Sequence, residues 1–306
     1  MSLRLIQKQK RMRVLTPEVA GSRRLSGRDC TLDLTQPCIM GVLNVTPDSF
    51  SDGGRFLNVE SAVQQGLAMQ QEGAAILDIG GESTKPGSLP VSIEEELARV
   101  IPVIEELRRN SDLPLSIDTS KALVAQKAVV AGVNFINDIS GLNFDPGMAA
   151  VAAETGAGIF LMHTRGRPET MQQHTEYQDL LAEVISSLRC SIEMALAAGV
   201  EQCRLAVDPG IGFGKSVTGN LALLHQLDEL HQLECPVLLG TSRKSFLGTV
   251  LNQGNPQERL YGTLATIASA VAQGVQMFRV HDVRPAREAA LVAWAIRERK
   301  LPESVS

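Results

Sequence analysis

The chain of 306 residues is 44% hydrophobic and 21% charged, the composition of an ordinary globular protein with room for one large domain. Its net charge of −5 and its aromatic content of 4% argue against the basic, ring-rich surface that binds nucleic acids. Its five cysteines form no C-x-x-C pair, and no apolar run reaches the roughly 18 residues of a membrane span. We therefore expect a soluble cytoplasmic protein with reduced thiols.

The first thirty residues are unusually basic. Eight arginines and lysines in this stretch face only Glu18 and Asp29. An acidic partner is one interpretation, and a solvated, partly ordered tail is the favoured one. We expect residues 1–30 to form a basic extension and residues 31–306 to form the main domain. A chain that begins near Asp29 is then expected to fold and to work normally.

From Cys38 onward, the sequence repeats a unit of a short apolar run, a polar or glycine-rich turn and an amphipathic helix. Apolar runs flanked by helices predict the strands of a parallel sheet that is buried on both faces. Eight such units predict closure into a single-domain (β/α)8 barrel, the TIM barrel of the α/β class. An open doubly wound sheet is the alternative, which the strand count and the lack of a G-x-G-x-x-G motif after the first run disfavour. The runs are residues 39–43, 75–79, 115–117, 134–136, 158–162, 204–207, 237–239 and 277–280.

Two segments match the capping box, in which side chains satisfy the free backbone amides of a helix's first turn. They are Ser92-Ile-Glu-Glu95 and Thr175-Glu-Tyr-Gln178. Helices are therefore expected to begin at these two places.

Polar residues follow nearly every predicted strand. These strand ends are Asn44, residues 80–84, Asp118, residues 137–138, His163, Asp208, residues 240–244 and residues 279–281. The active sites of (β/α)8 enzymes lie at the carboxyl ends of the strands. A single polar residue there is often only a helix cap, but a whole ring of them indicates a ligand pocket.

The last two strand ends suggest an anion site. Because side chains alternate along a strand, Arg279 and His281 share one face and can both point toward the barrel mouth. Residues 241–245 open a helix after the seventh strand, where free amides and the helix dipole attract anions. Anion sites after strands seven and eight are frequent in this fold, so the pattern indicates a phosphate or pyrophosphate group and a carboxylate.

Four further polar residues lie at the same level of the barrel, namely Asp118, Asn137, Asp208 and Lys244. A ring of carboxylate, amide and ammonium groups can bind the donor and acceptor edge of a planar heterocycle. A buried carboxylate is costly without a donor, so each aspartate needs a ring N–H or an amino group. The glycine-rich segments 46–54 and 83–87 follow the first two strands and suit either mobile lids or static turns.

The segment 40–54, Met-Gly-Val-Leu-Asn-Val-Thr-Pro-Asp-Ser-Phe-Ser-Asp-Gly-Gly, resembles the long first signature of the dihydropteroate synthase family. Six further segments resemble the other motifs of that family in the same order, and the match runs from about Thr31 to the C-terminus. They are residues 78–84, 116–119, 137–141, 208–215, 242–245 and 279–282. The resemblance implies a homodimeric transferase of folate biosynthesis. It would join 6-hydroxymethyl-7,8-dihydropterin diphosphate to p-aminobenzoate and release diphosphate.

The resemblance also implies which residues hold each part of the substrates. The pterin ring would be held by Asp118, Asn137, Asp208 and Lys244, with Ile139, Met162 and Gly240 packed around it. The diphosphate would be held by Asn44, Arg279 and His281, with the cofactor Mg2+ near Asn44. The p-aminobenzoate pocket would consist of Phe50, Thr84, Pro86, Phe213, Lys244 and Ser245, with the carboxylate on Ser245.

The resemblance places no residue as a covalent nucleophile, so catalysis is expected to be electrostatic. Asp118 and Asp208 would favour the positive charge that develops on the pterin, and Lys244 would bridge the two substrate sites. One residue departs from the family pattern, because Lys85 stands where the family usually has arginine. Lysine keeps the charge but loses the bidentate fork, which leaves the details of the second loop and of sulfonamide binding open.

Three other functions remain compatible with this barrel. A pterin-dependent methyltransferase with a corrinoid partner needs no diphosphate site, so Arg279 and His281 disfavour it. A non-catalytic pterin-binding protein is disfavoured because none of the strand-end residues is missing. A Schiff-base aldolase that uses Lys244 would be exposed by borohydride trapping with a carbonyl substrate.

Overall fold

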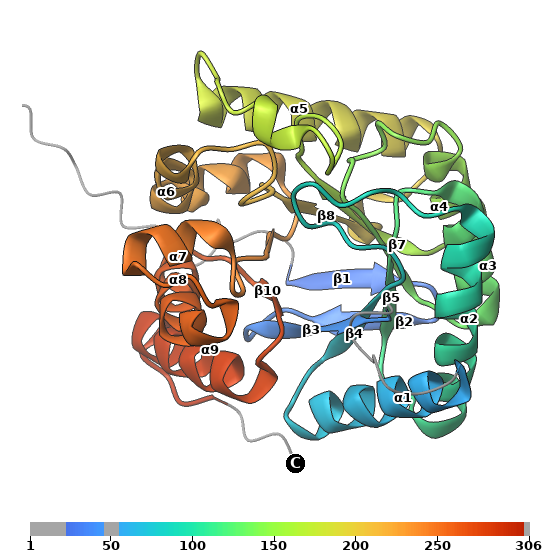
Figure 1. Ribbon diagram of the computed structural model, residues 1–306. Coiled ribbons are helices and arrows are strands. Elements are labelled where there is room, and N and C mark those ends of the chain that lie inside the picture. The colour runs from blue at the N-terminus through green and yellow to red at the C-terminus, as the bar shows by residue number, and fades with distance from the viewer. Residues whose placement is uncertain (1–22, 46–54, 303–306) are drawn as a thin grey trace, which may run out of the picture.

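The computed structural model describes residues 23–45 and 55–302, and a ring of parallel strands lies at its centre (Figure 1). These strands are β3 (Cys38–Asn44), β4 (Ile76–Gly80), β5 (Leu115–Asp118), β6 (Phe135–Asp138), β7 (Gly158–Met162), β8 (Leu205–Asp208), β9 (Leu238–Leu239) and β10 (Met277–Val280). Their order is β8-β7-β6-β5-β4-β3-β10-β9, and a parallel bridge between Val207 and Val237 joins the two edges. The predicted (β/α)8 barrel is confirmed, and every predicted apolar run contributes one of its strands.

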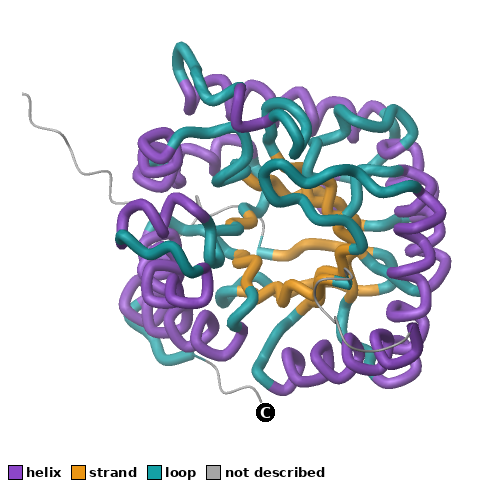
Figure 2. The backbone as a smooth tube through the Cα atoms, in the orientation of Figure 1, coloured by secondary structure: helices purple, strands orange, loops and turns teal. Residues whose placement is uncertain are grey.

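Helices surround the barrel on its outside (Figure 2). They are α1 (Arg55–Gln71), α2 (Ile93–Asn110), α3 (Ala122–Ala131), α4 (Met148–Thr155), α5 (Leu180–Ala197), α6 (Val217–His225), α7 (Ser245–Leu251), α8 (Leu260–Ala272) and α9 (Val283–Glu298). Short 3-10 helices are η2 (Met171–Gln173), η3 (Gln202–Arg204), η4 (Leu227–Leu233) and η5 (Pro256–Arg259). Apolar side chains between helices and strands form the main core, and in α2 Val100, Val103 and Ile104 are fully buried. Of the helices in the described ranges, none has the length and apolar character needed to cross a membrane.

The two predicted helix starts have different outcomes. Ser92 caps α2, and its Oγ accepts a hydrogen bond of 3.1 Å from the backbone N–H of Glu95. The second prediction is wrong, because α5 begins only at Leu180 and is capped by Asp179, which accepts from the N–H of Ala182. The carboxylate of Glu183 accepts from the backbone N–H groups of Gln178 and Asp179, so side chains cap this helix several residues after the predicted start.

A short antiparallel hairpin lies at the floor of the barrel. It consists of β1 (Arg24–Gly27) and β2 (Cys30–Asp33), and Figure 1 shows both strands within the ring of the barrel. Leu25 and Leu32 are buried in one cluster with Phe135 and Met277, the first residues of β6 and β10. Since these residues mark the amino ends of the strands, the hairpin closes the end of the barrel opposite the strand ends that carry the polar residues.

Polar contacts tie the hairpin to the barrel as well. Arg204 Nη1 donates to the carbonyl of Gly27 at 2.9 Å, and Arg28 Nη1 donates to the carbonyl of Val129 at 2.9 Å. The domain boundary expected after residue 30 therefore needs correction, because it cuts β2 and separates β1 from the strand with which it pairs. The basic side chains around β1 give this segment the composition of a solvated tail. Composition alone therefore did not reveal that Leu25 is buried.

Removal of the first hairpin strand should destabilise the whole protein. A chain that begins at Asp29 lacks Leu25, whereas one that begins at Arg23 keeps it, and loss of a buried leucine side chain typically costs about 2–5 kcal/mol. We expect the shorter chain to have a free energy of unfolding at least about 2 kcal/mol lower in urea titrations. Leu25→Ala in the longer chain should reproduce much of the loss, and Leu123→Ala, at a position 44% exposed, should not. Equal stability of the two chains would contradict a structural role for β1.

Candidate active site

The strand register brings several predicted site residues to one end of the barrel. Asn44 is the register partner of Gly80, which is in turn the partner of Asp118 on the next strand. Asp118 is paired with Asn137, and Asp208 ends β8. Because all eight barrel strands are parallel, these residues lie at the same mouth, which is where active sites of this fold occur.

A pair of ionic contacts at the mouth joins Arg279 to two buried aspartates. Its Nε donates to Asp78 Oδ2 and its Nη2 donates to Asp118 Oδ2, each at 2.6 Å. Burial raises the pKa of Asp118, Arg279 opposes that shift, and the nearby Asp78 carboxylate reinforces it. For Arg279 burial acts to lower the pKa, but the two carboxylates outweigh it and raise the pKa above its usual range. The guanidinium is thus permanently charged and already shared between two acids.

Each of these aspartates keeps one oxygen without a hydrogen-bond partner. Asn137 Nδ2 donates to Asp78 Oδ2 at 2.9 Å, so that oxygen accepts two bonds. The Oδ1 atoms of Asp78 and Asp118 are buried and have no partner among the described residues. A buried carboxylate oxygen without a donor is costly, so the mouth is arranged to receive donor groups from a ligand.

Asp208 and Lys244 form the other side of the mouth and converge on Gly240. A side-chain carbon placed on Gly240 would lie 3.7 Å from Lys244 Nζ and 3.9 Å from Asp208 Oδ2. Burial lowers the pKa of Lys244 to about 8, against the opposing charge of Asp208. Burial raises the pKa of Asp208, against the opposing charge of Lys244. Lys244 Nζ also donates to the carbonyl of Ile211 and lies 4.7 Å from the ring centroid of Phe213. The structure therefore brings together the predicted contacts to both substrates around this ammonium group.

A second ammonium group, that of Lys215, holds the loop after β8. Its Nζ lies 2.9 Å from each of three acceptors, His163 Nδ1 and the carbonyls of Gly210 and Phe213. An ammonium group has three protons, so these contacts use all of them. Gly210 has a φ of +67°, and any side-chain carbon there would lie 1.9 Å from the carbonyl oxygen of His163. The loop that carries Asp208 and Phe213 is thus clamped against the end of β7.

The contact with Lys215 requires a lone pair on His163 Nδ1. Burial, followed by the positive charge of Lys215, lowers the pKa of His163 to about 3. Burial lowers the pKa of Lys215 itself to about 7, which Asp208 opposes. The imidazole is therefore neutral at physiological pH and serves as an acceptor within the loop.

His281 lies in a similar environment at the end of β10. Its Nδ1 is 3.0 Å from Ser242 Oγ, and its backbone N–H donates to the same oxygen at 3.2 Å. Burial and the charge of Arg279 lower the pKa of His281 to about 4, so it is a neutral polar group at this mouth. Arg243, with a φ of +59°, pairs with Asp282 at 2.5 Å and so has a structural role in the anion-site motif.

The remaining predicted residues differ in position. Ile139 and Met162 are buried at the ends of β6 and β7, and Met162 is the register partner of Asp208. Ser245 begins α7 and is exposed, and Thr84 and Pro86 lie on the loop between β4 and α2. Phe50 lies outside the described residues. Lys85, on the same loop, is exposed, and its positive charge is the smallest of the named contributions that lower the pKa of His281.

The structure shows what a metal ion would meet at Asn44. No group of three or more His, Cys, Asp or Glu side chains in residues 23–45 and 55–302 is arranged to hold one. Asn44 Oδ1 and Asp118 Oδ2 each lie 3.7 Å from the position that a side-chain carbon on Gly80 would take. Mg2+ is usually bound by few protein oxygens together with substrate phosphates and water, so this oxygen-lined strand end fits the expected ion.

Sequence reasoning assigned no specific contact to three residues that organise the mouth, which are Asp78, His163 and Lys215, although it counted His163 among the polar strand ends. Asp78 carried a usable signal, because it is a carboxylate inside the predicted apolar run 75–79, and the structure buries it fully. His163 was marked only by its place at a strand end, and nothing in the sequence pointed to the contact between His163 and Lys215. Their partnership spans 52 positions in the chain and depends on how the β8 loop folds back.

The stability of the protein should depend on pH through His163. The variant His163→Gln keeps an acceptor for Lys215 but cannot take up a proton. Because the native pKa of about 3 lies below the ordinary 6.5, the stability from the neutral imidazole is complete above pH 6.5 and is lost as the pH falls toward 3. We expect the wild-type protein to lose up to about 2 kcal/mol relative to the variant between about pH 7 and pH 5, measured by urea unfolding. If the free energy of unfolding depended on pH in the same way in both proteins, His163 would not be buried in its neutral form.

Comparisons of the whole chain with known proteins all find the same family. The sequence matches the family model described as pterin binding enzyme over residues 40–281. The dihydropteroate synthase of Synechocystis sp. is 49% identical over 258 residues, which cover 84% of this chain and 89% of the relative. The Yersinia pestis dihydropteroate synthase in a sulfonamide drug complex is 46% identical, with a TM-score of 0.85 over 90% of this chain and 99% of that one. The Xanthomonas albilineans dihydropteroate synthase with 4-aminobenzoic acid is 44% identical, with a TM-score of 0.84 over 90% of this chain and 98% of that one.

Proposed function

The chain belongs to the pterin-binding enzyme family, among the dihydropteroate synthases, and from this membership we propose the reaction that it catalyses. It condenses 6-hydroxymethyl-7,8-dihydropterin diphosphate with p-aminobenzoate to give 7,8-dihydropteroate and diphosphate, a step of folate biosynthesis. The observation that carries the proposal is the mouth itself, where Asp118 presents a buried oxygen without a donor. A pterin ring edge, with its amino group and ring N–H, supplies the donors that such an oxygen lacks.

The pterin is held by the two sides of the mouth. Asp118 and Asp208 accept from its N–H groups, and Asn137 has an amide oxygen available because its Nδ2 already donates to Asp78. Lys244 lies between this pocket and the ring of Phe213, so one ammonium group contacts both substrates. The amine of p-aminobenzoate then lies next to the methylene carbon that carries the diphosphate.

We infer a dissociative displacement for the chemical step. The bond between the pterin methylene carbon and the diphosphate oxygen breaks first, and the electron pair leaves with diphosphate. The aromatic amine then forms the carbon–nitrogen bond and loses a proton to solvent. The carboxylates of Asp118 and Asp208 stabilise the positive charge on the pterin between these two events, which is electrostatic catalysis without a covalent intermediate.

The diphosphate is held on the other side of the carbon. The two bonds from Arg279 to the aspartates use two of its five donors, so the guanidinium has further donors for diphosphate oxygens. His281 contributes a neutral ring beside it. Asn44 would hold Mg2+, which when bound neutralises charge on the departing diphosphate.

The activity is tested by the release of diphosphate, which should require both substrates. Inorganic pyrophosphatase coupled to phosphate detection measures it, with each substrate omitted in turn. Methyl transfer from a methylated folate to a corrinoid, or a Lys244 adduct trapped by borohydride, would identify the methyltransferase or the aldolase instead. Binding of both substrates without diphosphate release would identify a non-catalytic pterin-binding protein.

Replacement of Lys244 should weaken the binding of both substrates. In Lys244→Ala a charge-assisted hydrogen bond is lost from a shielded pocket, which costs roughly 1.5–3 kcal/mol, or about ten- to 150-fold in affinity. Calorimetry with the pterin diphosphate and with p-aminobenzoate measures the two effects separately. Lys127→Ala, at an exposed position on α3, is the matched control and should leave both affinities unchanged. Unchanged affinity for either substrate in Lys244→Ala would contradict the bridging role.

We also propose that the protein is a homodimer in the cytoplasm. Three large apolar side chains are strongly exposed on the neighbouring helices α8 and α9, with Tyr261 at 82%, Val292 at 62% and Ile296 at 73%. Exposed apolar surface of this kind is typical of subunit interfaces. Light scattering of the wild-type protein and of Ile296→Asp gives the mass in each case, and a monomeric wild-type protein would contradict the dimer.

A further inference from the structure

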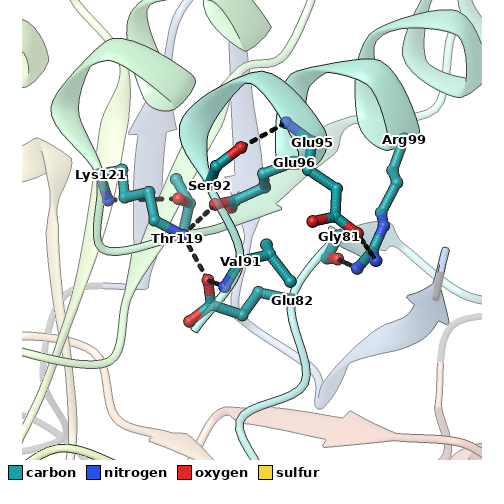
Figure 3. A network of polar contacts seen from close by, with 9 residues as sticks. All are labelled: Gly81, Glu82, Val91, Ser92, Glu95, Glu96, Arg99, Thr119 and Lys121. Carbon is teal, nitrogen blue, oxygen red and sulfur yellow. Dashed lines mark hydrogen bonds and ion pairs between the residues drawn. The ribbon is translucent and has the colours of Figure 1, made fainter. Parts of the chain in front are cut away.

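A polar cluster outside the mouth holds the base of the loop between β4 and α2 (Figure 3). Glu82 begins this loop, and its Oε2 accepts both from the backbone N–H of Val91 at 3.2 Å and from Lys121 Nζ. Arg99 Nη1 donates to the carbonyl of Gly81 at 2.6 Å. One carboxylate therefore draws together the two ends of residues 83–90, which form the rest of the loop.

Lys121 connects this loop to α2 through a buried acid. Its Nζ donates to Glu96 Oε2 at 2.5 Å, and the side chain of Glu96 is only 1% exposed. The other oxygen of Glu96, Oε1, is buried without a partner in the part of the chain that the structure describes. Burial acts to lower the pKa of Lys121, but the bonds from Glu82 and Glu96 outweigh it and raise the pKa. Lys121 is thus a firmly charged ammonium group shared by two carboxylates that would otherwise repel each other.

The cluster also reaches the pterin side of the mouth. Lys121 follows Asp118 by three positions, and its backbone N–H donates to Thr119 Oγ1 at 3.2 Å. The N–H of Thr119 in turn donates to the carbonyl of Asn137 at 3.1 Å. Lys121 is therefore attached through its backbone to the end of β5, which is proposed to bind the pterin. Its side chain binds the loop after β4, which is proposed to contact p-aminobenzoate.

The far end of the loop has a weaker attachment. The N–H of Gly87 donates to the carbonyl of Pro168 at 3.0 Å, and Ser83 Oγ lies 2.9 Å from Ser88 Oγ. Pro86 and Gly87 themselves are exposed. The position of the loop is consequently determined mainly at its base, where the ionic contacts are.

We propose that Glu82, Glu96 and Lys121 form a positioning cluster that sets the loop of Thr84, Lys85 and Pro86 for the amine substrate. The inference rests on the proposed function, because it assigns this loop to p-aminobenzoate. None of the three residues touches the reacting atoms, so the cluster acts through the loop. Its loss weakens the binding of p-aminobenzoate selectively, whereas the pterin and diphosphate contacts are retained, because Asp118 and Arg279 are held by their own bond to each other.

The test compares steady-state kinetics of variants in the full chain. Glu82→Gln keeps the size of the side chain and an acceptor for Val91 but loses the charge that binds Lys121. We expect it to raise KM for p-aminobenzoate by about tenfold, equivalent to about 1.4 kcal/mol, with KM for the pterin diphosphate changed less than about twofold. Glu106→Gln is the matched control, since Glu106 lies ten positions beyond Glu96 on α2 and pairs with the exposed Arg109 rather than with a residue of the cluster, and both KM values of this variant should stay unchanged.

A double variant separates a shared interaction from two independent effects. If Glu82 and Lys121 act through one contact, Glu82→Gln combined with Lys121→Met should raise KM for p-aminobenzoate no more than Lys121→Met alone. If Lys121→Met does not fold, Glu82→Gln decides the question by itself. Equal increases in both KM values, or a lower unfolding midpoint with unchanged KM values, would overturn the proposal and leave a purely structural role. Wild-type protein without substrate-dependent diphosphate release would instead overturn the proposed function.

Discussion

The mouth of this barrel depends on a single guanidinium group that is shared by two buried acids. Arg279, on β10, binds Asp78 on β4 and Asp118 on β5, and both aspartates are almost fully buried. Removal of one partner from a buried ion pair typically costs about 3–5 kcal/mol, because the charge that remains has neither water nor a counterion. The same arrangement leaves one oxygen of each acid without a donor, so the interaction that stabilises the mouth also prepares it for a ligand rich in N–H groups.

Two ammonium groups extend this organisation from the strands to the loops. Lys215 holds the β8 loop, which carries Asp208 and Phe213, and Lys121 holds the base of the β4 loop. In both cases a lysine is surrounded by oxygen or nitrogen acceptors and is removed from solvent to a large degree. A rigid barrel alone would place only the strand ends accurately, whereas ligand-binding loops need contacts of their own. The two loops after β4 and β8 are therefore each attached to the scaffold by an ionic or charge-assisted contact.

The floor of the barrel contrasts with the mouth in its chemistry. The β1–β2 hairpin closes it with Leu25 and Leu32 against the first residues of the barrel strands. Apolar closure at one end and polar strand ends at the other follow from the parallel arrangement, since every strand enters at the floor and leaves at the mouth. This division also explains why the amino-terminal hairpin contributes stability, and why the proposed chemical groups lie elsewhere.

The order of elements and the location of the site were determined by the sequence itself. Eight apolar runs with polar ends predict parallel strands and a shared mouth, because alternation and burial are local properties that periodicity records. The hairpin strand was missed, since one buried leucine between basic residues carries no periodic signal. Only the tertiary structure decided the pairings: Arg279 and Asp78 are 201 positions apart, and Lys121 and Glu82 are 39 apart. The pairing of charged side chains depends on strand register, loop path and side-chain direction in segments that are far apart in the chain. These features cannot be inferred from a single sequence.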